Sequence, residues 1–275
     1  MSIRNFLKKI SYNPFIVKAV RIFRLRGILR KFYYKYFCPD NGILNLRIGK
    51  IDAKFYVHTP DELRLAESVG GIRGEQKVIN ALVSHLSAGD VVYDVGANIG
   101  IYAVILAKAV GENGRIFAFE PEKNSVVRLR ENIKINNLKN IEIINKALGE
   151  NNAHGKLRMG KTTGNFSLIK IYEKEDDSQN VEIVNGDEYI INKKLPVPTA
   201  IKIDVEGYEY SVLAGLKNTL SDSMCRIICC EIHSGLFPDG ITETKILEFI
   251  KSFGFNKVDT FKRDFSAYHI IAQKN

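Results

Sequence analysis

Long hydrophobic runs are absent from this chain of 275 residues, and no segment is apolar for long enough to form a transmembrane helix. A signal-peptide core followed by a small-residue cleavage site is also absent. Cysteine is scarce, and the spacing of the four cysteines does not match a zinc site. Cys229 and Cys230 lie in an apolar run, which favours buried free thiols. Together these absences predict a reducing, cytoplasmic setting.

Acidic side chains are absent from residues 1–39, which contain ten Lys and Arg residues. Without those ten, 30 Lys and Arg face 31 Asp and Glu, so residues 40–275 carry a net charge of −1. The net charge of +9 therefore does not indicate a fold that follows a nucleic-acid backbone. We predict a basic amphipathic helical arm over residues 1–40, because residues 1–37 also hold many apolar and aromatic side chains. Two partners stay open for it: an anionic membrane surface on the inner membrane face, or an apolar surface of its own domain or of another protein.

The first glycine turn lacks the fingerprint of a dinucleotide site. Residues 91–100 indicate a buried strand, a tight turn and a helix start, which open a βαβ unit. Asn98 stands where G-x-G-x-x-G requires its second glycine. Asp94 ends the strand and would repel a pyrophosphate, but it would attract the cationic groups of S-adenosylmethionine. Glu120 ends the next strand and is placed to bind ribose hydroxyls. The alternative is a Rossmann-like domain with an empty or different nucleotide site.

Apolar segments with strand and helix periodicity alternate from Val91 to the end of the chain. This alternation predicts a doubly wound, mostly parallel α/β sheet, with ligands bound beyond the carboxyl ends of the strands. Residues 41–88 indicate a β-hairpin and a helix that precede the catalytic domain of residues 89–275. Residues 173–198 lack a strong period, and we expect them to form an insertion or lid. The seven strands are expected over residues 91–95, 115–119, 141–145, 200–205, 226–232, about 255–259 and 268–272.

Three segments of the chain resemble the signature blocks of the FkbM-type methyltransferases, and the resemblance covers roughly residues 70–275. The blocks are Asp94–Gly100, Ala118–Pro121 and Ile201–Glu209, of which the third is the most specific. The resemblance implies a class I, Rossmann-like fold, S-adenosylmethionine as cofactor, and O-methylation of a hydroxyl on a sugar, glycan or secondary metabolite. The cofactor-binding residues that it implies, including Glu75 for the methionyl amine and Ala147 for the adenine, are Glu75, Asp94, Gly96, Ala97, Asn98, Gly100, Tyr102, Glu120, Pro121, Ala147 and Asp204.

A second group of polar residues ends the strands at 200–205 and 226–232, which are neighbours in the class I topology. We predict that His233 is the general base, because its ordinary pKa lies nearest to working pH. Glu206 would orient it or hold the acceptor hydroxyl, Asp204 would face the cofactor or the acceptor, and Glu231 would support them. The competing hypothesis is a divalent metal ion held by the first three, which would acidify the hydroxyl. A purely structural role, in which these side chains tie loops to helix ends, is the third interpretation.

Motifs of nucleobase methylation are missing as well. No N-P-P-Y or D-P-P-Y run is present, and no Pro-Cys pair supplies the thiol of 5-methylcytosine enzymes. RNA methylation is therefore the second choice, and only the basic arm supports it. The third hypothesis is a non-catalytic module that binds the cofactor. The presence of all five polar site residues counts against it, because a degenerate site usually keeps fewer. Those five residues are Asp94, Glu120, Asp204, Glu206 and His233.

Overall fold

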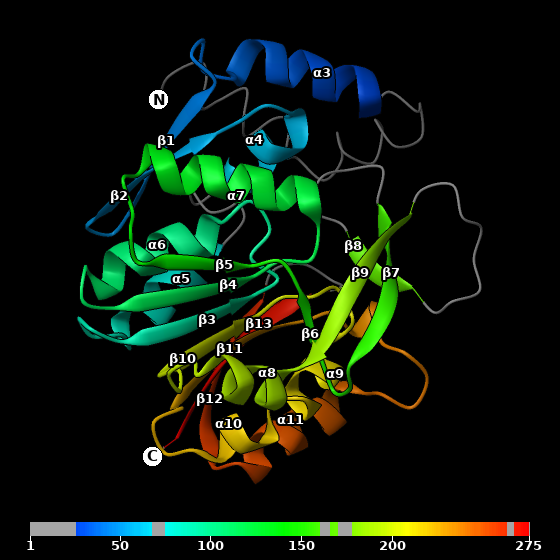
Figure 1. Ribbon diagram of the computed structural model, residues 1–275. Helices are drawn as coiled ribbons and strands as arrows, with labels where there is room; N and C mark the ends of the chain where they lie inside the picture. Colours follow the sequence, from blue (N-terminus) through cyan, green and yellow to red (C-terminus); the bar gives the residue numbers. More distant parts are fainter. Residues whose placement is uncertain (1–25, 68–74, 160–165, 170–177, 263–266, 275) are drawn as a thin grey trace.

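The computed structural model describes residues 26–67, 75–159, 166–169, 178–262 and 267–274, and its centre is a seven-stranded sheet between two layers of helices (Figure 1). The strand order is β12-β13-β11-β10-β3-β4-β5. Neighbouring strands from β5 to β11 are parallel, and β13 is antiparallel to both β11 and β12. The predicted doubly wound fold is confirmed. The strands are β3 (Val91–Val95), β4 (Arg115–Phe119), β5 (Ile141–Ile144), β10 (Ala200–Ile203), β11 (Ile227–Ile232), β12 (Phe255–Lys262) and β13 (Tyr268–Lys274).

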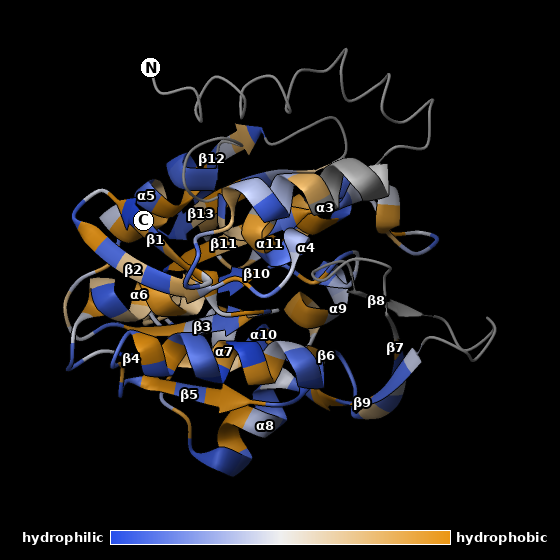
Figure 2. Ribbon diagram, turned by 90° about the horizontal axis from the view of Figure 1, so that it is seen from above, coloured by the Kyte–Doolittle hydropathy of each residue, from blue (hydrophilic) through white to orange (hydrophobic). Residues whose placement is uncertain are grey.

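Each face of the sheet has its own hydrophobic core. Helices α5 (Glu75–Ser84), α6 (Ile101–Val110) and α7 (Lys123–Ile135) cover one face, together with a β-hairpin. The opposite face is covered by α8 (Gly186–Lys193), α9 (Glu209–Ala214), α10 (Lys217–Ser221) and α11 (Glu243–Ser252). In Figure 2 strand β4, which lies between β3 and β5, is largely hydrophobic, whereas α7 alternates between hydrophobic and hydrophilic residues. This pattern follows from position, since a central parallel strand is buried on both faces and a covering helix on one.

The alternation of side chains along β11 assigns its residues to the two cores. Ile227 and Cys229 pack into the core with α5 and α6, and Ile228 and Cys230 pack into the other. Both cysteines are fully buried and unoxidised, as predicted. Burial raises the pKa of the Cys229 thiol to about 12, so this thiol stays protonated and unreactive.

The predicted hairpin is confirmed as β1 (Ile43–Ile48) and β2 (Ile51–Tyr56). It is followed by α4 (Pro60–Glu67), a helix that the sequence did not predict. Helix α3 (Arg26–Phe37), the described end of the basic arm, packs against this unit. The Tyr33 hydroxyl donates to Glu67 (2.8 Å), and the Tyr34 hydroxyl donates to the carbonyl of Val57 (2.8 Å). Residues 1–25 of the arm lie outside the described residues. Within the described part of the chain, no helix is long and apolar enough to span a membrane.

A second sheet, of order β6-β9-β7-β8, adjoins the carboxyl ends of the main strands (Figure 1). The sequence indicated a short β excursion at 155–172, and β7 and β8 confirm it. The sequence predicted an insertion without regular structure over residues 173–198, and this is corrected, because residues 178–193 form β9 and α8. Residues 170–177 lie outside the described part of the chain. Val181 and Ile183 are buried on one face of β9, while Glu182 between them points outward and pairs with Lys146. The strands are β6 (Ala147–Gly149), β7 (Ala153–Met159), β8 (Phe166–Ile169) and β9 (Ser178–Asn185).

Candidate functional site

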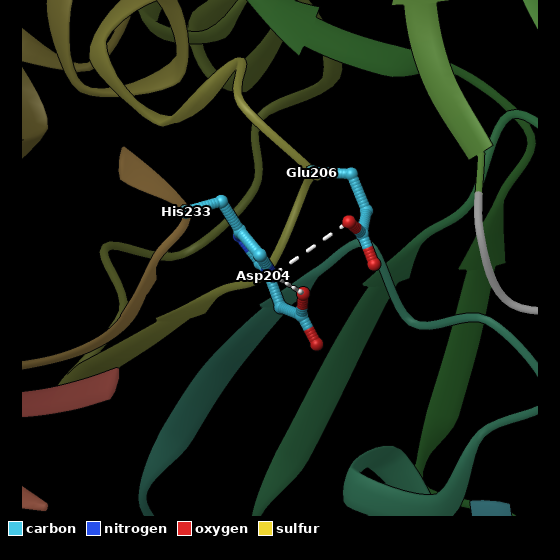
Figure 3. A group of neighbouring side chains, drawn as sticks. All are labelled: Asp204, Glu206 and His233. Atoms are coloured by element: carbon cyan, nitrogen blue, oxygen red, sulfur yellow. Dashed lines mark ion pairs between the residues drawn. The ribbon is translucent and has the colours of Figure 1, made fainter. Parts of the chain in front are cut away.

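The predicted polar cluster assembles at the carboxyl ends of β10 and β11. These strands are parallel neighbours, so the residues that follow them meet at one edge of the sheet. The Nε2 atom of His233 lies 3.7 Å from a carboxylate oxygen of Glu206 and 3.9 Å from one of Asp204 (Figure 3). His233 is buried, whereas the two acidic side chains are about a quarter exposed (27% for Asp204 and 25% for Glu206). A ligand can therefore reach the two carboxylates from solvent while the imidazole is held in the protein.

A residue that sequence reasoning missed, Glu209, orients His233. The Nδ1–H group of His233 donates to Oε1 of Glu209 at 2.7 Å, and the Glu209 side chain is fully buried. The backbone N–H of Gly207 donates to the same oxygen at 3.0 Å. Glu206 faces the other ring nitrogen, and its predicted role, to orient His233 or to hold an acceptor hydroxyl, stays a prediction. The signal that could have identified Glu209 is its place three residues after Glu206, in the first turn of a helix behind the strand.

Glu206 is presented by an unusual backbone. Its φ is +51°, a left-handed conformation that costs energy for a residue with a side chain. The next residue, Gly207, has φ +98°, and a Cβ there would lie 2.6 Å from the carbonyl oxygen of Leu236. The turn after β10 is thus fixed against the segment after β11. This fixed turn directs the Glu206 carboxylate toward His233.

Four carboxylates set the charge of His233. Burial alone would lower its pKa, but the hydrogen bond to Glu209 and the charges of Asp204, Glu231 and Glu206 outweigh burial and raise the pKa to about 9. Glu231, predicted as a supporting residue, is itself buried and lies 3.5 Å from Nε2. Its other oxygen is 3.3 Å from the buried ring of His269. The surrounding carboxylates therefore favour the protonated form of His233.

Asp94 has no exposed surface at the end of β3, and its predicted contact with the cationic groups of the cofactor stays a prediction. Its side chain is completely buried and lies 3.4 Å from the ammonium group of Lys202, which is also 3.4 Å from Asp204. Asp94 and Lys202 are register partners on β3 and β10, so the pairing follows from the strand order. Burial alone would lower the pKa of Lys202, but the two carboxylates raise it. The cation that Asp94 meets is thus Lys202, and Asp94 positions Asp204 through it.

Tyr102 and Glu75 lie behind this cluster, and both are buried. The ammonium group of Lys202 lies 4.7 Å from the centre of the Tyr102 ring. Burial, and next the charge of Glu75, raise the pKa of the Tyr102 hydroxyl. Among the described residues this hydroxyl has no hydrogen-bond partner. A buried hydroxyl without a partner indicates that a polar group of a ligand completes the site.

The glycine turn after β3 connects the two halves of the site. Gly96 has φ +79°, and a Cβ there would lie 1.9 Å from the carbonyl oxygen of Asp204, so only glycine fits. Asn98 has φ +52°, and its backbone N–H donates to Glu120 at 2.7 Å. Ala97 donates its backbone N–H to the carbonyl of Phe119 (3.1 Å), and Gly100, with φ +86°, caps α6. The turn is therefore fastened to the ends of both β4 and β10.

Glu120 is held at the end of β4 by backbone donors. One carboxylate oxygen accepts from Asn98 and the other from the N–H of Glu122 at 2.8 Å. Burial raises its pKa to about 7, although both hydrogen bonds act in the opposite direction. Pro121 follows, and its carbonyl accepts from Asn145 (3.1 Å) and Gln179 (3.0 Å). Ala147 is buried at the start of β6. Its expected place beside an adenine stays a prediction.

Comparison with known proteins identifies the family of the chain. Residues 94–257, more than half of the chain, match the Methyltransferase FkbM domain. The chain belongs to the FkbM methyltransferase family. A relative, the hexuronic acid methyltransferase AglP of Haloferax volcanii, is 29% identical over 195 residues, which cover 70% of this chain and 74% of AglP.

Solved structures with a similar chain course are methyltransferases with low sequence identity. Precorrin-6y C5,15-methyltransferase from Geobacter metallireducens is 18% identical, with a TM-score of 0.47, over 73% of this chain and 89% of that chain. A SAM-dependent O-methyltransferase from Thermotoga maritima is 14% identical, with a TM-score of 0.45, over 84% of this chain and 77% of that chain. The FkbM protein is an S-adenosylmethionine-dependent methyltransferase.

The residues at the glycine turn fit this cofactor. Glu120 keeps acceptor capacity for two ribose hydroxyls, since each of its oxygens accepts one backbone N–H. The orphan hydroxyl of Tyr102 and the buried carboxylate of Glu75 suit the polar end of the methionyl group. The carboxylates of Glu75, Asp94 and Asp204 outnumber the one ammonium group of Lys202, so this part of the site favours the positively charged groups of the cofactor. These residues would hold the cofactor between the turn and the cluster at His233.

Proposed function

We propose that this FkbM enzyme methylates a hydroxyl of a sugar or glycan. The observation that carries the proposal is the convergence of His233, Asp204 and Glu206 on one small volume, with His233 fixed from behind by Glu209. The carboxylates of Asp204 and Glu206 accept hydrogen bonds, so they can align the O–H of an alcohol. The name of the relative AglP supports a sugar as the acceptor, because that protein acts on a hexuronic acid.

A hexuronic acid offers a carboxylate as well as hydroxyls, and the charges of the site favour a hydroxyl. Four acidic side chains act on His233, and an acceptor carboxylate entering among them would be repelled. A hydroxyl is neutral and can donate to a carboxylate oxygen of Asp204 or Glu206. We therefore place the transferred methyl group on an oxygen of an alcohol rather than in an ester.

The chain has three tasks in this reaction. Bound S-adenosylmethionine supplies a methyl group that a sulfonium already activates. Asp204 and Glu206 orient the hydroxyl toward it. In the metal-free mechanism His233 accepts the hydroxyl proton on Nε2 while Glu209 stabilises the imidazolium. Because the pKa of His233 is raised to about 9 in the free protein, His233 would first have to release its proton to water, which the positive charge of a bound cofactor would favour.

Radiolabelled S-adenosylmethionine tests the proposal when the full chain is incubated with monosaccharides, uronic acids and lipid-linked glycans. We expect label that survives mild alkali, because an ether resists the hydrolysis that removes a methyl ester. Alkali-labile label would instead indicate a carboxylate acceptor, and label in RNA would support the second candidate. Tight cofactor binding without transfer to any acceptor would indicate a non-catalytic module.

A further inference from the structure

Three side chains from the segments that follow two neighbouring strands, β10 and β11, present ligand atoms to one point. One ligand atom each from Asp204, Glu206 and His233 lies within 4.8 Å of the others (Figure 3). Adjacent ligands of an octahedral Mg²⁺ or Mn²⁺ ion are about 3 Å apart, given metal–oxygen distances near 2.1 Å. The observed separations of 3.7 and 3.9 Å from Nε2 are slightly larger. Small side-chain rotations close this gap without any movement of the sheet.

The hydrogen bond of Glu209 fixes which ring nitrogen is available. Since Nδ1–H donates to Glu209, it is Nε2 that faces the two carboxylates. A histidine ligand held by a carboxylate on its other nitrogen is the usual arrangement at metal centres. The second oxygen of Glu209 is buried and has no hydrogen-bond partner within the described residues. Its charge is therefore compensated mainly through His233, and a cation bound at Nε2 would complete that compensation.

Positive charge is also in short supply around the cluster. Carboxylates of Asp204, Glu206, Glu209 and Glu231 all act on His233, and the nearby ammonium of Lys202 is shared between Asp94 and Asp204. We propose that Asp204, Glu206 and His233 bind a divalent metal ion, Mn²⁺ or Mg²⁺. This inference rests on the proposed O-methylation, because the ion would activate the acceptor hydroxyl. Carboxylate oxygens suit both ions.

The metal ion gives the reaction a route that does not use His233 as a base. The ion binds the acceptor oxygen and lowers the pKa of its hydroxyl, whose proton passes to water. The oxygen lone pair then forms the C–O bond with the methyl carbon. The C–S bond breaks at the same time, and its electron pair stays on sulfur as the sulfonium becomes a neutral thioether. A neighbouring hydroxyl of a sugar can bind the same ion and fix the acceptor.

Mn²⁺ is the probe, because its free concentration is measured directly by electron paramagnetic resonance. The full chain is treated with EDTA, desalted, saturated with S-adenosylhomocysteine and titrated with MnCl₂. We expect one bound ion per chain and a loss of affinity of about tenfold or more in Glu206→Gln and His233→Gln. The matched control is Glu248→Gln, an exposed position on α11, which should bind as the parent does. Calorimetry with S-adenosylhomocysteine establishes that each variant is folded.

The outcomes separate this site from the proposed function. Absence of Mn²⁺ binding by the folded parent, or equal binding by Glu206→Gln and Glu248→Gln, would overturn the metal site. Methyl transfer to a sugar hydroxyl that survives EDTA would do the same and leave the O-methyltransferase proposal intact. Mn²⁺ binding that depends on Glu206 supports the site even if no sugar accepts a methyl group, a result that would count against the acceptor class alone.

Discussion

Glu209 and His233 are joined by a hydrogen bond of 2.7 Å in which both side chains are buried. The Nδ1 atom of His233 is thereby bound to Glu209, and the Nε2 atom faces Asp204 and Glu206. The arrangement serves a base and a metal ligand equally well, because both need Nε2 at a fixed angle. Glu209 is thus a positioning residue, and its contribution can be measured apart from binding of the cofactor.

Glu209→Gln should reduce kcat by about 10–100-fold, the usual cost of losing the charged partner of a functional histidine. Glutamine keeps the shape but neither the charge nor the choice of ring tautomer. Cofactor affinity should be unchanged, since the hydrogen bonds of Glu209 are to Gly207 and His233 and not to the glycine turn or to Glu120. Steady-state kinetics and calorimetry measure the two effects. A variant with full turnover would show that the hydrogen bond only ties the segment after β11 to α9.

Glu120→Gln should remove a pH dependence of cofactor affinity. The ribose hydroxyls favour the ionised carboxylate, whose pKa is raised to about 7 in the folded protein. Below pH 7 binding must therefore expel a proton, and affinity falls by up to about tenfold per unit of pH. Calorimetry between pH 6 and pH 8.5 would show this slope in the parent and a flat, weaker profile in the variant. Equal slopes in both would assign the dependence to another group.

Ionisation of Glu120 should favour cofactor binding but lower the stability of the cofactor-free protein. The pKa of Glu120 in the folded state, about 7, lies above the ordinary value of 4.5. Its contribution to stability is fully present below pH 4.5 and is lost as pH rises through 7. Cofactor-free Glu120→Gln should therefore resist urea better than the parent at pH 8, and the difference should shrink toward pH 5. A gain that is the same at both values would point to a cause other than ionisation.

Lys202→Met should destabilise the fold by about 3–5 kcal/mol, because it leaves buried Asp94 without its cation. The double variant Asp94→Asn, Lys202→Met should recover part of this loss, since the remaining carboxylate of Asp204 is partly solvated. Urea denaturation of the two singles and the double variant gives the coupling free energy. Simple additivity would show that Asp94 and Lys202 do not stabilise one another.

The basic arm should bind anionic membranes through the exposed aromatic pair of α3. Phe32 and Tyr36 are 56% and 59% exposed, with ring centres 4.3 Å apart, while the opposite side of α3 packs on its own domain. We expect the full chain to co-sediment with phosphatidylglycerol vesicles at low salt, and Phe32→Ser, Tyr36→Ser to weaken this by about tenfold or more. Ile191→Ser, at a 68% exposed position on α8, is the control. Equal sedimentation of all three proteins would exclude this surface.

The sequence predicted the sheet well because each central strand is buried on both faces and appears as a short apolar run, such as Ile227–Ile232. It also predicted that Asp204, Glu206 and His233 meet, since strand ends converge in a doubly wound sheet. It did not predict the partners of charged groups. Asp94 pairs with Lys202 because β3 and β10 are in register, and no local pattern reveals a register between strands more than 100 residues apart.

Regular structure was missed where buried positions were few. Strand β9 shows period-two burial at Val181 and Ile183 only, between charged and amide side chains, and its pairing with β6 and β7 supplies what the pattern lacks. Helix α4 has eight residues, too few for a clear amphipathic repeat. Glu209 was visible in the third signature block, but its inward direction depends on how α9 packs behind the strand.

The contact between Gly96 and the backbone of Asp204 has a kinetic consequence. No side chain separates the turn that would hold the cofactor from the strand end that would hold the acceptor, and a single added methyl group would collide at 1.9 Å. A shift of the turn when the cofactor binds would therefore also displace the backbone of Asp204. We therefore expect compulsory-order kinetics, with S-adenosylmethionine entering first and S-adenosylhomocysteine leaving last. Product-inhibition patterns would show S-adenosylhomocysteine competing with the methyl donor and not with the methyl acceptor.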